Sequence, residues 1–473
     1  MFDIDTAVPT NGVYHWVFVP TGNLSVTDQV AAIKSGNAYI NIHSANYPGG
    51  EIKGFFQLTA GSSTFTPPAA PPALPGGTPT TNDAVRFLTQ ATFGATDATI
   101  TQVQAMGFSA WIDDQMALPM SSHLANVYAY LIANPTAQPR GEPVYNTWWK
   151  YALIAPDQLR QRVAFALSEI LVVSQDSPGL SQAPWGLASY YDVLVTNAFG
   201  NFRQLLNDVT LHPAMGEFLD MVKNDKPDIA TGRNPNENYA REVLQLFSIG
   251  LQKKHPDGSL KLNSQGVPVP TYLQDEIVGF AHTFTGWAFY STNQSFSAGA
   301  NWTNQMILIA SHHDTTNEKL LLDNVVLPAG QTGTQDLQDA LDVIYNHPNV
   351  GPFICRQLIQ RLVTGNPSPA YIYRVSSVFN NNGAGVRGDL GAVVRAILLD
   401  YEARTTTNLL HQGTGHLREP LLRTTAILRA LKATSVSTNY VMNSTDTSLA
   451  QTPMRSPTVF NFFEPDYSEP GAI

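Results

Sequence analysis

The sequence predicts a mainly α-helical protein, with a large multi-helix domain over residues 82–473. A partial antiparallel β module over residues 1–60 and a Pro/Gly/Thr-rich linker over residues 61–81 precede that domain. Two observations support this division. Apolar residues recur with a helical period after residue 82, whereas before residue 60 several segments have the composition or the alternation of strands. A chain of 473 residues is long enough to form more than one domain.

The β module is predicted from three segments. Residues 13–19 are rich in β-branched and aromatic side chains, and residues 38–43 alternate apolar and polar positions. Residues 46–50 contain Pro and two Gly, so we expect a turn there, with residues 51–58 returning as the partner strand. The chain opens inside a β pattern, which suggests a fragment of a longer precursor.

Proline dominates the segment that follows. Residues 66–79 contain too few backbone N–H groups to join a sheet or a helix, and their spacing favours a polyproline-like, semi-rigid tether. We therefore predict a domain boundary here.

The predicted helical domain begins at Asn82, which can cap a first turn containing Asp83. Helices are expected at residues 82–91, 159–173, 190–195, 201–206, 236–250, 273–284, 335–346, 350–363, 371–380, 388–401 and 416–432. Strands are expected to be few, with short ones near residues 305–309 and 320–327. The chain shows no internal repeat and no heptad run.

The central feature of this domain is the segment from Asn234 to Gly250, which has the pattern of an amphipathic helix. At about 100° per residue, one arc of the helix carries only polar side chains. They are Glu237, Asn238, Arg241, Glu242, Gln245 and Ser248. Asn234 or Asn236 can cap the first turn, and Gly250 suits the left-handed position after the helix.

The spacing within this polar stripe admits two interpretations. Four-residue intervals let Glu237 contact Arg241 and let Asn238 contact Glu242. In the first interpretation these contacts form a lattice that fixes neighbouring helices. In the second the stripe is the wall of a polar cleft, with one carboxylate held by Arg241 and the other free to titrate.

Composition excludes several classes of partner. The net charge of -10 argues against nucleic acid, which needs clustered Lys and Arg, and against polybasic membrane binding. No run approaches about 20 apolar residues, so no transmembrane segment is expected. The start of the chain lacks a signal peptide. The single cysteine, Cys355, lies in an apolar helical context and is expected to be buried and inert.

Two family resemblances follow from local motifs. Residues 36–44 and 46–54 resemble the end of a chordin-type (CHRD) domain, which implies an extracellular β-sandwich module and hence a secreted or cell-surface protein. Further motifs resemble, in order, the bacterial family called domain of unknown function 1800. They are Arg86–Gly94, Ala198–Arg203, His212–Met215, Asn236–Glu242 with Gly250, Phe284–Trp287, His313–Asp314 and Arg455–Phe460. The resemblance implies that the chain is a member of this family and that the protein is exported. It implies no particular activity, because the family has none that is settled.

Two departures from that family are expected to matter. Many members carry a His-Asn-His-Phe-like helix where this chain has Leu167–Ile170, so any chemistry that depends on those histidines is absent here. The chain also stops soon after Phe460–Pro465, short of the family's usual C-terminal helices. A missing end is expected to leave apolar surface uncovered.

Candidate site residues come from the polar stripe and from segments expected to pack near it. Glu237, Glu242 and His282 are the catalytic candidates, and Asn238, Arg241, Gln245, Trp287 and Arg356 are the binding candidates. His313 and Asp314 could join the two glutamates as ligands of a divalent metal ion, although no His-Glu-x-x-His or Cys-x-x-Cys motif supports one. No Gly-rich phosphate loop is present, so no nucleotide cofactor is expected.

Paired carboxylates beside aromatic residues are the arrangement that binds and cleaves sugars. The sequence therefore suggests a hydrolase acting on an extracellular polysaccharide. The alternative is a non-catalytic secreted module that binds a glycan or a secreted partner protein, or serves as a matrix scaffold. The position of Glu237 and Glu242 discriminates the two: an open pocket shared with His282 favours the enzyme, and burial among partners favours the scaffold.

Overall fold

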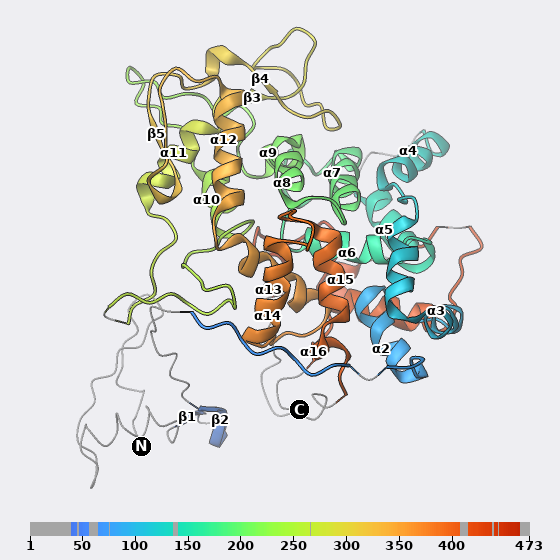
Figure 1. Ribbon diagram of the computed structural model, residues 1–473. Helices are drawn as coiled ribbons and strands as arrows, with labels where there is room; N and C mark the ends of the chain where they lie inside the picture. Colours follow the sequence, from blue (N-terminus) through green and yellow to red (C-terminus); the bar gives the residue numbers. More distant parts are fainter. Residues whose placement is uncertain are drawn as a thin grey trace. The chain divides into compact units, whose positions relative to one another are not determined.

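The computed structural model describes residues 39–44, 47–55, 65–74, 76–135, 141–264, 266–406, 415–437, 439–442 and 444–463. Contacts divide the chain into a small N-terminal unit that ends at Thr64 and a helical unit over Phe65–Ser468. The strand predicted at residues 13–19 lies outside the described residues. The mainly α-helical fold class is confirmed (Figure 1).

The described part of the N-terminal unit is one hairpin. Strand β1 (Tyr39–Ser44) pairs antiparallel with β2 (Tyr47–Phe55), placing Ile42 opposite Ile52. The predicted turn at residues 46–50 is wrong for Tyr47–Gly50, which belong to β2. The reason is that Ser44 already pairs with Tyr47, so the connection between the strands is much shorter than the Pro-Gly-Gly signal indicated.

The described part of the Pro-rich segment has no helix or strand up to Thr80. Thr80 then caps α2 through a reciprocal pair of hydrogen bonds with Asp83. The cap therefore lies two residues before the predicted Asn82, because the Thr80 hydroxyl can reach the backbone N–H of Asp83 and Asn82 is already helical.

The helices of the first half of the helical unit include one central helix that is almost wholly buried. They are α2 (Thr81–Ala91), α3 (Asp97–Ala117), α4 (His123–Ala133), α5 (Glu142–Ile154), α6 (Gln158–Ser168), α7 (Pro184–Asn197), α8 (Phe202–Leu211), α9 (Pro213–Phe218), α10 (Asn238–Gln245) and α11 (Gln274–Thr283). The central helix is α6, which is buried except at Arg160 and Ser168 and contacts α3, α5, α7 and α13.

The second half adds a group of helices that packs on α6 and α8 through α13 and α12. They are α12 (Gly333–Asn346), α13 (Val350–Leu362), α14 (Pro369–Asn380), α15 (Leu390–Leu399), α16 (Tyr401–Arg404), α17 (Pro420–Ala430) and α18 (Thr445–Ser448). Trp148, Trp149, Tyr190, Tyr191 and Phe202 are among the largest fully buried side chains, so these aromatics form the core.

Residues 284–332 form an irregular lobe between α11 and α12, drawn in yellow in Figure 1. Strand β3 (Trp287–Ala288) pairs with β4 (Ile307–Leu308), and β5 (Lys319–Leu320) pairs with β6 (Val326–Leu327). The 3₁₀ turns η1 (Ala310–His312) and η2 (Leu322–Asn324) complete the lobe. The short strands predicted near residues 305–309 and 320–327 are confirmed.

Two predicted helices are too long. The helix predicted at 236–250 is α10, which ends at Gln245; Ser248 is fully buried, and its hydroxyl donates to the carbonyl of Val243. Ser248 is therefore not part of a polar surface. The helix predicted at 159–173 ends at Ser168, where Glu169 is the C-cap. Apolar burial continues past both ends, so hydrophobic periodicity could not show where the helices stop.

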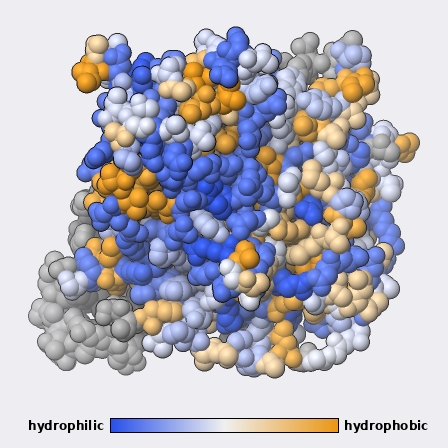
Figure 2. Space-filling view, turned by 45° about the horizontal axis from the view of Figure 1, so that its top comes forward, coloured by the Kyte–Doolittle hydropathy of each residue, from blue (hydrophilic) through white to orange (hydrophobic). Residues whose placement is uncertain are grey.

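The face of the helical unit in Figure 2 is mostly polar, and its apolar side chains form scattered patches. Among the described residues, no helix has the length and hydropathy needed to cross a lipid bilayer.

Candidate functional site

The polar stripe of α10 is tied into its surroundings at its first turn. Glu237 Oε2 lies 2.9 Å from Arg241 Nη2, which confirms the predicted pair. The same oxygen accepts a hydrogen bond of 2.8 Å from the amide of Gln274, at the start of α11. Asn238 donates to Asp220 Oδ2 at 3.0 Å. These contacts join α10 to α11 and to the chain that follows α9.

Glu242 occupies a different environment on the same helix. Its exposed fraction is 8%, and its Oε2 has no hydrogen-bond partner among the described residues. Burial raises the pKa of Glu242, and Arg241 offsets part of that shift. Neither Glu237 nor Glu242 lines any of the four cavities described in the helical unit.

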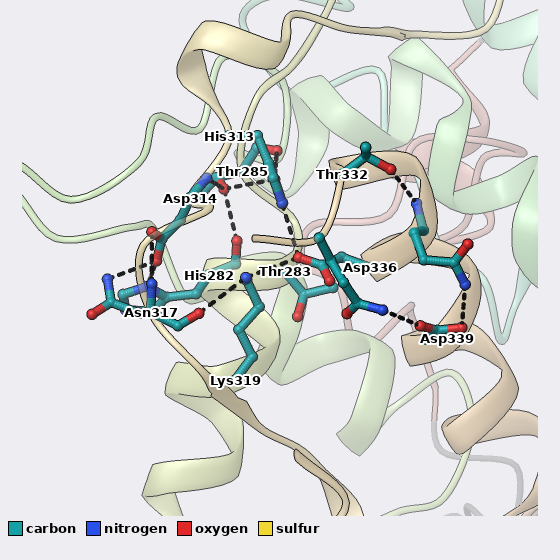
Figure 3. Close-up of polar contacts among 12 residues, drawn as sticks. His282, Thr283, Thr285, His313, Asp314, Asn317, Lys319, Thr332, Asp336 and Asp339 are labelled. Carbon is teal, nitrogen blue, oxygen red and sulfur yellow. Dashed lines mark hydrogen bonds and ion pairs between the residues drawn. The ribbon is translucent and has the colours of Figure 1, made fainter. Parts of the chain in front are cut away.

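His282 and the metal candidates lie in a separate polar network (Figure 3). His282 Nδ1 lies 2.5 Å from Asp314 Oδ2, and Asp314 also accepts from Asn317 and Thr316. Burial opposes ionisation of Asp314, but these hydrogen bonds outweigh it and hold the pKa of Asp314 well below its usual value. Gln274 and His282 are eight residues apart on α11, about 12 Å along the axis, so Glu237 and His282 belong to different contact networks.

The neighbouring His313 belongs to a second part of this network. Its Nε2 and the Nζ of Lys319 both lie 2.9 Å from Oδ2 of Asp336. His313 Nδ1 lies 3.0 Å from the carbonyl oxygen of Thr285. Figure 3 shows His313 and Lys319 of the lobe converging on Asp336 of α12. Because His313 and Asp314 are engaged in this way, they work as ties between α11, the lobe and α12.

No group of three or more His, Cys, Asp or Glu with the geometry of a metal site occurs in the described part of the chain.

The network fixes the start of β3. Gly286 has a φ of 88°, and a Cβ there would lie 2.9 Å from the backbone nitrogen of His313. The Gly286 N–H donates to Asn224 O at 2.8 Å, and the carbonyl of Trp287 accepts from the Lys223 N–H at 2.7 Å. Trp287, the first residue of β3, is only 5% exposed, so its side chain is a packing residue. The lobe is thereby held against residues 220–224.

That contact creates an acidic groove, which we define as two cavities that share Glu217 and Asp220. One has a volume of about 530 Å³ and the other about 450 Å³. The first is lined further by Asp225, Asn234, Asn236, Lys223, Phe289 and Phe296, among others. The second is lined by residues of the 174–178 loop, including Asp176, and by Ser456 and Pro457.

Two phenylalanines of the lobe line one side of the groove. Phe289 packs edge-on against Trp302 with ring centres 5.2 Å apart, and the Lys223 ammonium lies 5.3 Å from the Phe289 ring centre. Phe296 stacks on His312 at 3.7 Å with an interplanar angle of 5°. His312 in turn contacts Asp225 at 3.0 Å. The phenylalanines are thus held by contacts with neighbouring side chains.

The two shared acids differ in environment. Burial raises the pKa of Glu217, and the charge of Asp220 raises it further, while Lys223 opposes the shift. Asp220 is exposed and holds a φ of 58°, and Lys223 holds a φ of 59°. Backbone strain of this kind costs about 1–3 kcal/mol per residue and gathers at functional sites. The groove therefore pairs an acid that keeps its proton to higher pH with a solvated carboxylate.

Sequence reasoning named Asn234 and Asn236 only as capping residues and missed both acids of this groove. Glu217 and Asp220 lie at and just beyond the end of α9, a short helix that begins at Pro213 after the His212 cap. The His-Pro signal marked this turn, but the acids meet the lobe phenylalanines only through tertiary packing. The binding candidates Gln245 and Arg356 both line another cavity, at the opposite end of α10.

The fold and the groove define a class of protein: a mainly α-helical domain with a polar, acid-lined surface site. The family described as "Protein of unknown function (DUF1800)" matches residues 86–473, and the CHRD domain matches residues 5–56. The chain belongs to the DUF1800 family. No curated protein and no solved structure matches it.

Proposed function

We propose that the protein is an exported hydrolase that cleaves an extracellular polysaccharide in the acidic groove. Glu217 is the proton donor and Asp220 is the second carboxylate of the pair. The observation that carries the proposal is that both acids lie where two open cavities meet, so a chain-like substrate can pass over them. The CHRD match supports the extracellular setting.

The chemistry follows from the difference between the two acids. A carboxyl group with a raised pKa can protonate the oxygen of a leaving sugar, while an ionised partner activates water or attacks the ring. Phe296, which is partly exposed, offers an apolar face for a sugar ring, and Asn234 and Asn236 offer amides for its hydroxyl groups. Activity that depends on protonated Glu217 should fall as the pH rises through the pKa of this residue.

The test uses Glu217→Gln and Asp220→Asn on the full chain with a panel of neutral and acidic polysaccharides. We expect each change to lower kcat by about 10²–10⁴-fold. Glu318→Gln and Asp114→Asn are the matched controls, because both residues are exposed and neither lines the groove. Turnover that is equal in Glu217→Gln and Glu318→Gln would remove Glu217 from the mechanism.

A second candidate is a non-catalytic binding or scaffold module. The observation that favours it is the engagement of Glu237 by Arg241 and Gln274 together with the burial of Glu242. It predicts glycan binding by the wild-type chain without turnover of any member of the panel. Asp220→Asn would then weaken glycan binding, and neither this variant nor the wild type would show turnover.

A further inference from the structure

A second cavity, at the C-terminal end of α10, has the opposite charge from the acidic groove. We call it the basic pocket and define it by its three cationic lining residues, Lys254, Arg356 and Arg361. Its volume is about 470 Å³, and the amides of Gln245, Gln252, Gln357 and Gln360 contribute to its walls. Among the described residues of the lining, Glu169 is the one acid. Three cations collected in a chain of net charge -10 call for a specific explanation.

Two of these cations face each other without a counter-ion. Lys254 and Arg356 make no side-chain hydrogen bond or ion pair within the described ranges of the chain. Burial lowers the pKa of Lys254, and the nearby charge of Arg356 lowers it further. Like charges held together in a partly buried site repel each other. An anion between them would remove that repulsion.

The acid on the pocket floor does not supply the missing negative charge. Glu169 is 6% exposed and lies within hydrogen-bonding reach of Glu419. Burial and Glu419 raise the pKa of Glu169 well above its usual value. Burial also opposes ionisation of Glu419, but His416 and Arg162 outweigh it and lower the pKa of Glu419 to about 2. The pair therefore holds one proton between its two acids, so Glu169 does not bring a full negative charge to the pocket.

Two buried polar atoms of the lining are left without partners. Oε2 of Glu169 and Nε2 of Gln357 make no hydrogen bond among the described residues. The Gln357 amide is a hydrogen-bond donor, whereas Oε2 of Glu169 is an acceptor, because the proton of the acid pair lies between Glu169 and Glu419. Leaving the Gln357 amide buried and unpaired costs about 1–3 kcal/mol, so a ligand that accepts from it gains that energy. The Arg361 guanidinium holds the floor in place by donating to the Glu169 carbonyl at 3.0 Å.

From these contacts we infer that the basic pocket binds an oxyanion, namely the carboxylate, sulfate or phosphate group of a small ligand. Arg356 and Lys254 neutralise its charge, and the Gln357 amide donates a hydrogen bond to one of its oxygens. Phe353 and Phe460 supply apolar walls for the rest of the ligand. This inference is independent of the chemistry proposed for the acidic groove.

The test is isothermal titration calorimetry of the full chain with sodium sulfate, sodium phosphate and sodium glucuronate. Chloride keeps the ionic strength constant across the titrations. We expect saturable binding of at least one oxyanion, and binding about tenfold weaker in Arg356→Gln and in Lys254→Gln, the loss of one charge-assisted hydrogen bond. The ligand that binds most tightly identifies which of the three groups the pocket takes.

Arg423→Gln is the matched control, because Arg423 is exposed on α17 and lies outside the pocket. In chloride alone, Arg356→Gln should melt at the wild-type temperature or above, since it relieves repulsion of Lys254. Absence of saturable binding in the wild-type chain overturns the inference, and so does equal affinity in Arg356→Gln and Arg423→Gln. Because binding is measured directly, the result does not depend on whether the groove is catalytic.

Discussion

Nε2 of His313 lies 2.9 Å from Oδ2 of Asp336, and the two side chains are only 1% and 0% exposed. The same carboxylate oxygen lies 2.9 Å from Nζ of Lys319, which is also 0% exposed. Asp336 is thus the one acid that balances a buried ammonium group where the lobe meets α12. The stability of the lobe depends on that balance, and it can be tested directly.

Asp336→Asn should lower the free energy of unfolding by about 3–5 kcal/mol, because it leaves the Lys319 ammonium buried without a counter-charge. Urea unfolding followed by circular dichroism measures the change. Asp339→Asn on the same helix is the control: Asp339 accepts only from the amides of Gln331 and Gln335, so about 1 kcal/mol is expected. Equal losses of unfolding free energy in the two variants would show that the buried ion pair stabilises the protein no more than the hydrogen bonds of Asp339.

Gly286→Ala should destabilise the protein by more than the ordinary penalty for a left-handed residue. Its Cβ would meet the His313 backbone at 2.9–3.0 Å. Gly383 is the matched control, since its φ is 93° and nothing lies within 4 Å of its added Cβ. We expect about 1–2 kcal/mol for Gly383→Ala from the backbone alone, and clearly more for Gly286→Ala. Thermal unfolding of both variants decides whether the contact between β3 and His313 is as tight as described.

Stability should fall as the pH drops below about 6.5, with His212 as one cause. Burial lowers the pKa of His212 to about 3, so the folded chain keeps this ring neutral while the unfolded chain protonates it near pH 6.5. The unfolded state then binds more protons, and the free energy of unfolding declines by up to about 1.4 kcal/mol per pH unit.

The variant that isolates this effect is His212→Asn. His212 caps α9 by accepting from the Ala214 N–H, and Asn is also a good cap. Urea unfolding at pH 7, 6 and 5 should show a shallower decline for His212→Asn than for the wild type. An unchanged slope would assign the acid sensitivity to other groups, such as His347, whose pKa burial lowers to about 4.

The two glutamates of α10 should respond in opposite ways to neutralisation. Glu237→Gln removes a partly exposed ion pair and should cost at most about 1 kcal/mol. Burial raises the pKa of Glu242 and so disfavours its carboxylate form in the folded chain; Glu242→Gln should therefore leave the stability at pH 7 unchanged or raise it. Thermal melts at pH 7 compare them. A large loss in Glu242→Gln would mean that its carboxylate has a stabilising partner.

Helix positions could be predicted from the sequence where the apolar stripe ended at a polar boundary. The expected helices at 335–346 and 350–363 correspond to α12 and α13 within two residues. The Glu237–Arg241 contact is confirmed, because it depends only on local spacing. Gly250 has the predicted left-handed backbone, with a φ of 71°, but it lies five residues beyond the end of α10 and does not terminate that helix. The prediction that Ser248 belongs to the polar stripe is wrong, because burial continues beyond the last turn of α10.

The candidate site could be predicted only in part. Asn234 and Asn236 line the groove within the segment selected from the sequence. Glu217 and Phe296 come from different segments, and spacing along the chain carries no information on how folding unites them. The same holds for Glu169 and Glu419. The departure from the family noted at Leu167–Ile170 has a structural consequence, because it places Glu169 on the floor of the basic pocket.

Helix α10 has eight residues and is therefore about 12 Å long. Asn236, two residues before its first turn, lines the groove, and Gln245, its last residue, lines the basic pocket. The two sites therefore lie at opposite ends of one short helix. Thermodynamic reciprocity sets the rule for any coupling between them: the factor by which an occupant of the groove changes affinity in the pocket equals the factor by which an occupant of the pocket changes affinity in the groove.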